Sequence, residues 1–419
     1  MLDNQSSPRV FRYRLLLAPA FLFACCAITW VRGGAQPNEG PERTKTGIDV
    51  LEEQHFAALR RKRVGLITNQ TGVDAKGRRT IDVLAHAEGV KLVAVFSPEH
   101  GVAGKVEDTG VVNSLDSTTG LPIYSLYGET RRPTQQMLAN VDALVFDIQD
   151  AGVRFYTYIT TMGYAMEEAA KRHIGVFVLD RPNPLGGEVI EGPMLDQDRL
   201  SFVGYFPMPV RYAMTIGELA QMFNAENKIG ADLHIIAMDD WHRSEIFADT
   251  GLKWIPPSPN LRTLDETFLY PGIEPLQAGG VSVGRGTIKA FEFVGAPWLE
   301  PSAEFADELE GRQLPGVRFF AAGIIPLGGP YAGQMCHGAF VFVTDPATFR
   351  SARLGIELAD ALHRMFPAKF QLDKTIFLIG SQSTIERIKR KDAPANIIAD
   401  WEPDLEKFRV MRQKYLLYH

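Results

Sequence analysis

The pentapeptide Ser97-Pro98-Glu99-His100-Gly101 places a carboxyl group and an imidazole side by side, directly after the apolar run Val90 to Phe96. A carboxyl group can give or take a proton during bond cleavage, and an imidazole can do the same or bind a polar substrate. A β-branched run that ends in such residues is typical of a strand's carboxyl end in an α/β enzyme. The same residues also fit a plain loop in which Glu99 caps the next helix and His100 faces water.

Three further polar clusters follow predicted strands in the same way. Asn69-Gln70-Thr71-Gly72 follows the first strand, Asp147 to Arg154 overlaps and follows the fourth, and Asp180 to Pro184 follows the fifth. If the strands are parallel, all these clusters lie at one edge of the sheet, where open α/β sheets bind their ligands. Asp and Asn also favour turns and helix caps. This preference explains the cluster after the fifth strand well, but it explains the clusters after the second and fourth strands less well.

The order of the predicted elements indicates a Rossmann-like, doubly wound and mainly parallel α/β domain, followed by a smaller α+β domain. The expected strands of the first domain are Arg63–Thr68, Lys91–Phe96, Leu121–Leu126, Ala143–Ile148, Ile174–Leu179 and Leu233–Met238. The expected helices between them are Val50–Lys62, Thr80–Ala87, Pro133–Asn140, Thr157–Arg172 and Thr215–Asn227. Residues 254–286 are rich in turn-forming residues and show little periodicity. We expect a signal peptide over 1–35, a linker over 36–46, the catalytic domain over 47–266 and the C-terminal domain over 267–419.

The first residues are typical of a protein that is exported. Three arginines within residues 9–14 precede the apolar run Leu15 to Val31, and small residues end at Ala35. A basic, apolar and then small pattern predicts a cleaved signal peptide, and therefore a periplasmic or extracellular protein with no stable membrane span. A retained membrane anchor and a lipid anchor at Cys25 are the alternatives.

The composition fits an ordinary globular enzyme or binding protein. The chain has 419 residues, 45% of them hydrophobic and 22% charged, with a formal net charge of −6. It has no long basic block, so no nucleic-acid partner is expected. Because the bulk charge is negative, an anionic ligand needs arginines or lysines gathered locally. Cys336 is the only cysteine after the leader, which excludes a disulfide within the mature chain.

Several kinds of chemistry lack their usual motif. The first strand is not followed by a Gly-x-Gly-x-x-Gly loop, so a nicotinamide cofactor is not favoured, and no Gly-x-Ser-x-Gly elbow for acyl transfer is present. His100, Asp150 and Asp180 match no metal-ligand template, and we expect neither metal nor cofactor. Aromatic residues next to Arg154 suit a sugar, whose ring has apolar faces and polar edges. Arg285, between two glycines, either clamps a carboxylate or belongs to a structural turn.

An ordered set of short motifs runs through the chain. They are Ser97-Pro98-Glu99-His100-Gly101, Ser125-Leu126-Tyr127-Gly128, Asp147 to Tyr158, Asp180-Arg181-Pro182-Asn183-Pro184, Thr215-Ile216-Gly217-Glu218-Leu219, Pro257-Ser258-Pro259-Asn260, Tyr270-Pro271-Gly272 and Gly284-Arg285-Gly286-Thr287. As an ordered set they resemble the NamZ-type exo-β-N-acetylmuramidases, over about residues 47 to 419. The resemblance implies a glycoside hydrolase that removes N-acetylmuramic acid from the non-reducing end of peptidoglycan fragments. It also implies a Rossmann-like domain, a smaller C-terminal domain and a site in the cleft between them.

The resemblance assigns the catalytic acid to Glu99 and places His100, Asp150 and Arg154 in the lining of the site. One loop departs from the family's pattern. Gln277-Ala278-Gly279-Gly280 stands where the resemblance leads us to expect Glu-Gly-Thr-Asn, so an amide replaces a carboxylate.

Cleavage of a glycoside needs an acid for the leaving oxygen and a base or nucleophile for the anomeric carbon. We expect Glu99 to be the acid; for the second role, Asp150 could activate water or the substrate's acetamido group could attack. The expected substrate-binding residues are Asn69, Gln70, His100, Arg154, Tyr156, Asn183 and Arg285. The two arginines are candidates for the lactyl carboxylate of muramic acid. The altered loop favours an alternative, an exported sugar- or muropeptide-binding protein without catalysis, and a metal-dependent hydrolase is a further one.

Overall fold

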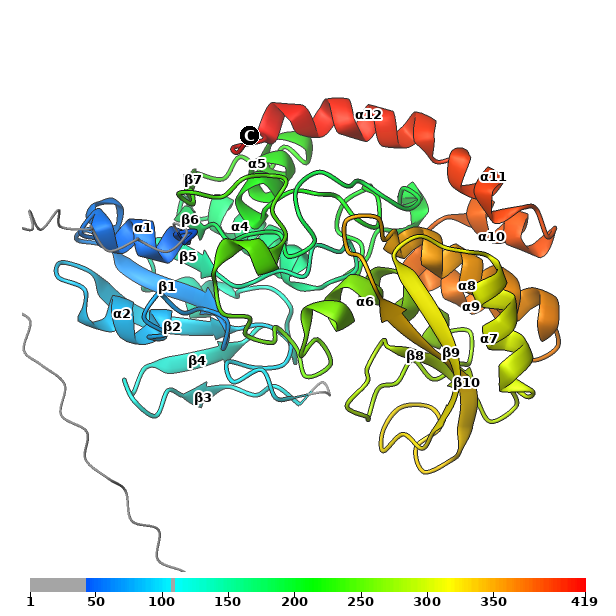
Figure 1. Cartoon of the computed structure of the whole chain (residues 1–419). Helices are drawn as coiled ribbons and strands as arrows, with labels where there is room; N and C mark the ends of the chain where they lie inside the picture. Colours follow the sequence, from blue (N-terminus) through cyan, green and yellow to red (C-terminus); the bar gives the residue numbers. More distant parts are fainter. Residues whose placement is uncertain (1–42, 107–109) are drawn as a thin grey trace, which may run out of the picture. The chain divides into compact units, whose positions relative to one another are not determined.

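The computed structural model describes residues 43–106 and 110–419, so the predicted leader and most of the predicted linker lie outside the described residues. The first half of the chain is built on a seven-stranded sheet of order β3-β4-β2-β1-β5-β6-β7 (Figure 1). Its strands are β1 (Arg63–Thr68), β2 (Lys91–Ser97), β3 (Ser114–Leu115), β4 (Pro122–Ser125), β5 (Ala143–Asp147), β6 (Gly175–Leu179) and β7 (Leu233–Ile236). All neighbours pair in parallel except the short edge strand β3. The predicted doubly wound α/β fold is confirmed.

Helices cover both faces of this sheet, because alternate side chains of each strand point to opposite sides. The helices are α1 (Gly47–Glu53), α2 (Thr80–His86), α3 (Gln135–Leu138), α4 (Tyr158–Ala170) and α5 (Ile216–Glu226). Val64 and Leu66 of β1 pack in one apolar cluster with α1 and α2, whereas Ile67 packs in a second cluster with α4 and α5. Strands β5 and β6 are buried along their whole length, as expected for strands covered on both sides.

The first helix is shorter than predicted and begins earlier. The main-chain N–H of Thr46 donates to Asp49 Oδ2 at 2.9 Å, which caps α1 at its start. His55 and Phe56 have positive φ angles, which a helix does not allow, so α1 ends at Glu53. The prediction of one helix over Val50–Lys62 was therefore wrong, and a 3-10 turn, η1 (Ala57–Leu59), follows instead.

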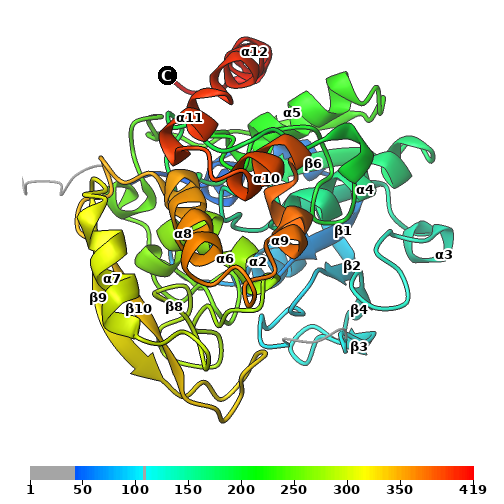
Figure 2. The ribbon, with the colours of Figure 1, turned by 90° about the vertical axis from the view of Figure 1, so that its right-hand side faces the viewer.

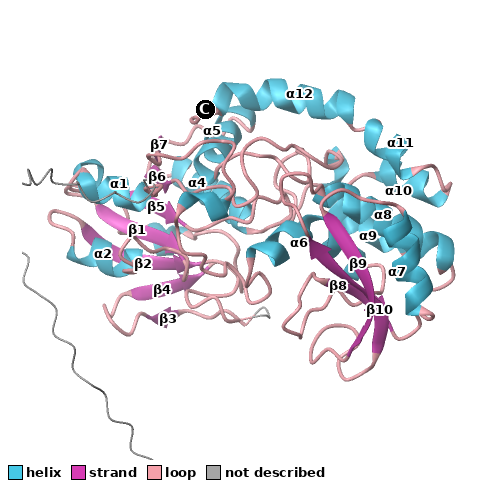
Figure 3. Ribbon diagram, viewed as in Figure 1, coloured by secondary structure: helices cyan, strands magenta, loops and turns pink. Residues whose placement is uncertain are grey.

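The second half of the chain carries a smaller, antiparallel sheet packed against helices (Figure 3). Its strand order is β8-β10-β9, with β8 (Phe293–Ala296), β9 (Val317–Ile324) and β10 (Cys336–Val343). The helices are α6 (Leu264–Gln277), α7 (Ser302–Gly311), α8 (Ser351–Met365), α9 (Leu372–Ile379), α10 (Gln382–Lys389), α11 (Pro394–Ala399) and α12 (Glu402–Arg412). Three more 3-10 turns are η2 (Gln197–Arg199), η3 (Phe247–Thr250) and η4 (Gln413–Tyr415). No helix within the described ranges is long and apolar enough to cross a membrane.

Helix α6 lies in the stretch that the sequence predicted to be irregular. Its start is fixed by Thr263, whose Oγ1 accepts the N–H of Glu266 at 3.1 Å while the Glu266 carboxylate accepts the N–H of Thr263 at 2.9 Å. Gly272 lets α6 approach α8 closely, since a Cβ there would lie 2.1 Å from the carbonyl oxygen of Ser351. Figure 2 shows α6 beside α8 and α9. Two prolines lie inside α6, so residue type alone did not predict a helix here.

The chain end returns to the first sheet. Helix α12 leads back towards α5 in Figure 1, and the Tyr418 hydroxyl donates to Asp180 Oδ2 at 2.6 Å, directly after β6. The larger apolar cluster contains residues of β5 and α4 together with residues of α6 and α8. The two halves therefore share one continuous core.

Candidate active site

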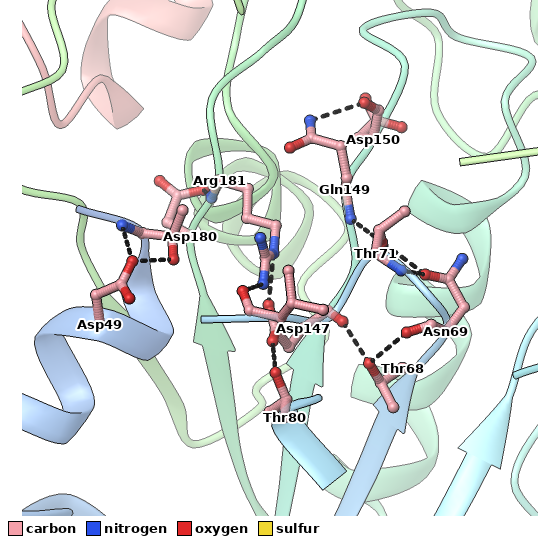
Figure 4. A network of polar contacts seen from close by, with 12 residues as sticks. Asp49, Thr68, Asn69, Thr71, Thr80, Asp147, Gln149, Asp150, Asp180 and Arg181 are labelled. Atoms are coloured by element: carbon pink, nitrogen blue, oxygen red, sulfur yellow. Dashed lines mark hydrogen bonds and ion pairs between the residues drawn. The ribbon is translucent and has the colours of Figure 1, made fainter. Parts of the chain in front are cut away.

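The polar clusters that follow β1, β2 and β5 meet at one edge of the sheet, because β1 pairs in parallel with both β2 and β5. Asn69 and Asp150 are joined through a short chain of hydrogen bonds (Figure 4). Asn69 Oδ1 accepts the N–H of Thr71 at 2.9 Å, and the N–H of Gln149 donates to Thr71 Oγ1 at 2.9 Å. The prediction that these strand ends converge is confirmed.

Glu99 lies immediately beyond β2, with its carboxylate held by neighbouring hydroxyl groups. Thr157 Oγ1 donates to Glu99 Oε2 at 2.5 Å. The hydroxyl of Tyr158 is 3.4 Å from the Glu99 carbonyl oxygen and donates to the carbonyl of Pro257 at 2.7 Å. Burial, reinforced by the charge of Glu99 and a hydrogen bond to it, raises the pKa of Tyr127 to about 12. The Glu99 carboxylate is thus fixed among uncharged hydroxyl groups on a half-buried loop.

Three buried tyrosines form the wall next to Glu99. Tyr156 lies edge-on to Tyr158, with ring centroids 4.8 Å apart, and edge-on to Tyr270 at 6.0 Å. Burial raises the pKa of all three hydroxyl groups, so they stay protonated and act as neutral donors. Tyr270 comes from α6, so both halves of the chain build this wall. Amphipathic rings of this kind suit the surface of a sugar.

Asp150 is a buried carboxylate with one unused oxygen. Its Oδ2 accepts the Tyr212 hydroxyl and, at 2.7 Å, the N–H of Gly152. In the described part of the chain its Oδ1 has no hydrogen-bond partner. Burial raises the pKa of Asp150 to about 6, although hydrogen bonds from Tyr212, Gly152 and Ala151 oppose the shift. At neutral pH the group is therefore an ionised acceptor with a free lone-pair position.

A third carboxyl group, Glu274, belongs to the site and was not predicted. Glu274 forms a bidentate pair with Arg285: Oε1 lies 2.7 Å from Nη2 and Oε2 lies 3.2 Å from Nε. The guanidinium also lies over the ring of Phe291, 5.1 Å from its centroid. Burial raises the pKa of Glu274, Arg285 opposes this, and the charge of Glu99 adds to it. Tyr270 and Glu274 are one helical turn apart, a spacing that would have revealed the pair had the segment been recognised as a helix.

Four charged groups influence the pKa of the Tyr270 hydroxyl. Burial is the largest cause of its raised pKa; the charges of Glu274, Glu99 and Asp150 add to it, and Arg285 opposes it. The three carboxyl groups and the arginine therefore lie within electrostatic reach of one phenol. Hydrolysis of a glycoside uses a pair of carboxyl groups, and this site offers candidates for both.

His100 and Gln70 hold the loops around Glu99. His100 Nδ1 is 2.6 Å from the carbonyl oxygen of Val106, and because a carbonyl only accepts, Nδ1 carries a proton. Gln70 Nε2 donates to the carbonyl of Pro256 at 2.7 Å. The side-chain amide of Gln70 packs against Gly104, where a Cβ would lie 2.1 Å from it. Both residues thus lie beside the site and fix the backbone on either side of it.

Two predicted substrate-binding residues are used elsewhere. Arg154 is 1% exposed and donates to four backbone carbonyls, at 2.8 to 2.9 Å. Those carbonyls belong to Pro193, Met208, Leu378 and Ile379. Asn183 closes a turn, donating to the carbonyl of Met214 at 2.9 Å and accepting the N–H of Leu185 at 3.0 Å. These contacts give both residues a structural role and leave Arg285, paired with Glu274, as the predicted arginine that remains at the site.

Residues of the usual metal-ligand types do not cluster in the part of the chain that the structure covers. Across residues 43–106 and 110–419, no group of three or more His, Cys, Asp or Glu side chains is arranged to hold a metal ion.

Two family models match successive parts of the chain. Residues 64–265 match the N-terminal domain of the exo-beta-N-acetylmuramidase NamZ, and residues 268–418 match its C-terminal domain. A relative from Bacillus subtilis (strain 168), named peptidoglycan beta-N-acetylmuramidase NamZ, is 44% identical over 380 residues, which are 90% of this chain and 92% of the relative.

Two solved structures share the fold. Both are DUF1343 family proteins from Bacteroides fragilis NCTC 9343. The first is 39% identical with a TM-score of 0.84, over 90% of this chain and all of the other. The second is 29% identical with a TM-score of 0.73, over 90% of this chain and 99% of the other. With both halves matched in order and the strand-end cluster in place, the chain belongs to the exo-β-N-acetylmuramidase NamZ family.

Proposed function

We propose that this protein is an exo-acting glycosidase that releases N-acetylmuramic acid from the non-reducing end of peptidoglycan fragments during cell-wall turnover. The observation that carries the proposal is the placement of Glu99 at the carboxyl end of β2, where Thr157 Oγ1 holds its carboxylate at 2.5 Å beside a wall of buried tyrosines. Family membership and the relative named as a peptidoglycan β-N-acetylmuramidase support the same reaction.

Glu99 is the proposed general acid. Its carboxyl group protonates the glycosidic oxygen as the bond to the anomeric carbon breaks. If the acetamido group attacks, Glu99 then takes a proton from the water that opens the cyclic intermediate; if Asp150 activates the water, Asp150 takes that proton and Glu99 is reprotonated by solvent. Thr157 and the hydroxyl of Tyr158 hold the residue in one position, so the proton is delivered to a defined point. Positioning of this kind lowers the barrier because the reacting groups are already oriented.

Asp150 is the proposed second group. A carboxylate with one unpartnered oxygen can accept a proton from an attacking water or orient the N–H of the substrate's acetamido group. Both roles need an ionised acceptor, which Asp150 provides above about pH 6. Arg285 is the proposed cation for the lactyl carboxylate; Glu274 already holds its Nη2 and Nε, so the guanidinium acts here through its positive charge.

Helix α6 still carries a carboxylate near the altered loop at Gln277. Glu274 lies three residues earlier, on the same side of the helix, and supplies a charged oxygen beside Arg285. The loop itself is tightly packed, because a Cβ on Gly279 would lie 2.3 Å from the ring of Phe370. We therefore favour a catalytic protein over a sugar-binding protein that has lost the chemistry.

Glu99→Gln tests the proposal with a chromogenic β-glycoside of N-acetylmuramic acid. Glutamine keeps an oxygen for the hydroxyl of Thr157, so the fold should be unchanged, while kcat should fall by about 10²–10⁴-fold. The matched control is Glu88→Gln, an exposed residue just before the other end of β2, which should keep full activity. Activity of E99Q within tenfold of the unaltered protein would show that Glu99 is not the acid. Binding of the sugar by the unaltered protein without any release would support the binding-protein alternative.

Export is proposed on the basis of the leader. A basic, apolar and small-residue pattern ending at Ala35 supports cleavage by a signal peptidase, with lipidation at Cys25 as the competing outcome. Determining the first residue of the protein from exported fractions distinguishes the two. A chain beginning at Gln36 supports cleavage, and a modified Cys25 supports the anchor.

A further inference from the structure

A cavity of about 360 Å³ opens at the carboxyl edge of the large sheet, between the ends of three parallel strands. It is lined by Thr71 after β1, Gln149 after β5 and Arg181 after β6. Between β1 and β5 the strand order reverses, because the chain leaves β1 for β2 on one side and later returns to β5 on the other. In open α/β sheets this is the place where ligands bind. We call this space the switch-point cavity.

The switch-point cavity is separate from the Glu99 cluster. The segment 255–257 forms the partition, since Ile255 lines the cavity while the carbonyl of Pro257 accepts the Tyr158 hydroxyl on the other side. Gln70 braces this partition through its 2.7 Å hydrogen bond to the carbonyl of Pro256. Neither Glu99 nor Arg285 lines the cavity.

Arg181 offers a fixed cationic donor at the cavity. Its side chain is only 6% exposed, yet it lines the cavity. Nε is 2.6 Å from Asp147 Oδ1, and Nη2 donates to the carbonyl of Val73 at 2.9 Å (Figure 4 shows the pair with Asp147). Among the described residues Nη1 makes no hydrogen bond, so the guanidinium is held rigidly with one nitrogen to spare.

Three further cations surround the opening. Arg43, Lys76 and Lys253 line the cavity from three different segments of the chain. Within residues 43–106 and 110–419, neither lysine ammonium forms an ion pair with a carboxylate. In a chain whose net charge is −6, this gathering of positive charge is local and attracts an anion.

The two acidic residues of the cavity are already engaged by the protein. Asp49 accepts the N–H of Thr46 at 2.9 Å and the N–H of Ala75 at 2.6 Å. Asp74 accepts two main-chain N–H groups and the guanidinium of Arg78. The oxygens of both carboxylates therefore already have donors, and the lining holds four cationic side chains against these two carboxylates.

The remaining lining is apolar, with Phe247, Leu252 and Ile255 facing the same space. A bare ion would leave these side chains in contact with water, and the volume is close to that of a small-molecule site. We propose that the switch-point cavity binds a small organic oxyanion, a carboxylate or a phosphate monoester with an apolar group attached, at a site distinct from the catalytic cluster. Arg181 and the two lysines hold the charged end, and Phe247 with its apolar neighbours packs on the other end.

Two probes with the same apolar group test this site: phenyl phosphate and hippurate, with benzyl alcohol as the uncharged control. Calorimetric titration of the purified protein should give saturable one-to-one binding of at least one of the anions and none of the alcohol. The tighter probe tells whether the natural ligand is a phosphate ester or a peptide-like carboxylate. Lys76→Gln combined with Lys253→Gln should weaken binding by at least about tenfold, because two charge-assisted contacts are removed.

Two controls make the test specific. Lys91→Gln, an exposed lysine at the amino end of β2, should bind the probe like the unaltered protein. Glu99→Gln should also bind it normally, and because that measurement needs no turnover, it stands apart from the proposed activity. Absence of binding by both anions, unchanged binding by the double lysine variant, or weakening of binding by E99Q would each overturn the proposal.

Discussion

Asp150→Asn should make the protein more stable at neutral pH while lowering its activity. The carboxylate is 5% exposed, and burial holds its pKa at about 6 against an ordinary value of 3.8. At pH 7.5 the folded protein therefore carries a buried charge that it tolerates poorly. Asparagine removes the charge and keeps an oxygen for the Tyr212 hydroxyl and the N–H of Gly152.

The expected gain in the free energy of unfolding follows from the difference between the pKa of Asp150 in the folded protein and its ordinary value. A shift of about two pH units at 1.36 kcal/mol each amounts to ~3 kcal/mol. The new amide N–H₂ has no partner where the free Oδ1 now lies, which costs about 1 kcal/mol and leaves a net gain of ~2 kcal/mol. The folded protein keeps this proton up to about pH 6, whereas the unfolded chain loses it near 3.8. Stability of the unaltered protein therefore falls as the pH rises through that window, so the gain is full above pH 6 and absent below pH 4.

Asp180→Asn is the matched control, because burial also raises the pKa of Asp180 to about 6. Here both oxygens are used. Oδ1 accepts two main-chain N–H groups and Oδ2 accepts two hydroxyl groups, from Arg181, Gly217, Thr215 and Tyr418. An amide nitrogen would leave at least two of these donors without an acceptor, at about 1–3 kcal/mol each. The free energy of unfolding of D180N should therefore lie ~2 kcal/mol or more below that of D150N.

The assay is urea unfolding of the three proteins at pH 7.5 and at pH 4, with kcat on the muramic acid glycoside measured beside it. D150N should unfold at higher urea at pH 7.5 only, and its kcat should fall by about 10²-fold or more if Asp150 acts in the reaction. Equal destabilisation by D150N and D180N, or a gain that persists at pH 4, would refute the electrostatic reasoning. Full activity of D150N would instead remove Asp150 from the proposed mechanism.

Two further predictions follow from the contacts of single residues. Glu274→Gln should lower kcat/KM by about tenfold or more, because Arg285 loses its charged bidentate partner. Steady-state kinetics measure this change, and unchanged constants would show that the pair serves the fold alone. Arg154→Met should lower the free energy of unfolding by about 3–5 kcal/mol, since four backbone carbonyls lose their donor. The kcat per folded molecule should stay the same. A stable R154M protein with poor turnover would instead show that Arg154 acts in the site.

The large sheet and the residues at its edge were predictable because both depend on short-range patterns. The strand Arg63–Thr68 has the predicted bounds, and the other predicted strands of this sheet differ by two residues or fewer at each end. Buried parallel strands are continuous apolar runs, which few other structures produce. Once the strands were placed, the parallel topology alone brought Asn69, Glu99 and Asp150 to the same edge.

Helix α6 could not be found from residue type, because Pro271 and Pro275 within it are read as breakers. Tertiary contacts override that local preference: Gly272 packs directly on α8, and the capping box at Thr263 fixes the start. Glu274 was missed for the same reason, since its place beside Glu99 depends on the helix being there. Of the second part of the chain, the sequence therefore predicted Arg285 but missed the carboxylate of Glu274 that pairs with it.

The prediction for Arg154 differs from the structure in another way. Its position along the chain, after β5, was as expected, but its side chain contacts other partners than those expected. The guanidinium turns inward and binds the carbonyls of Leu378 and Ile379, more than two hundred residues away. No local pattern can reveal a contact of that kind, because the acceptors are main-chain atoms that every residue carries. The same contact links the loop after β5 to helix α9, which packs against α6, and α6 carries Glu274. Arg154 thus serves the site indirectly, by holding together the two halves of the chain whose carboxyl groups must meet.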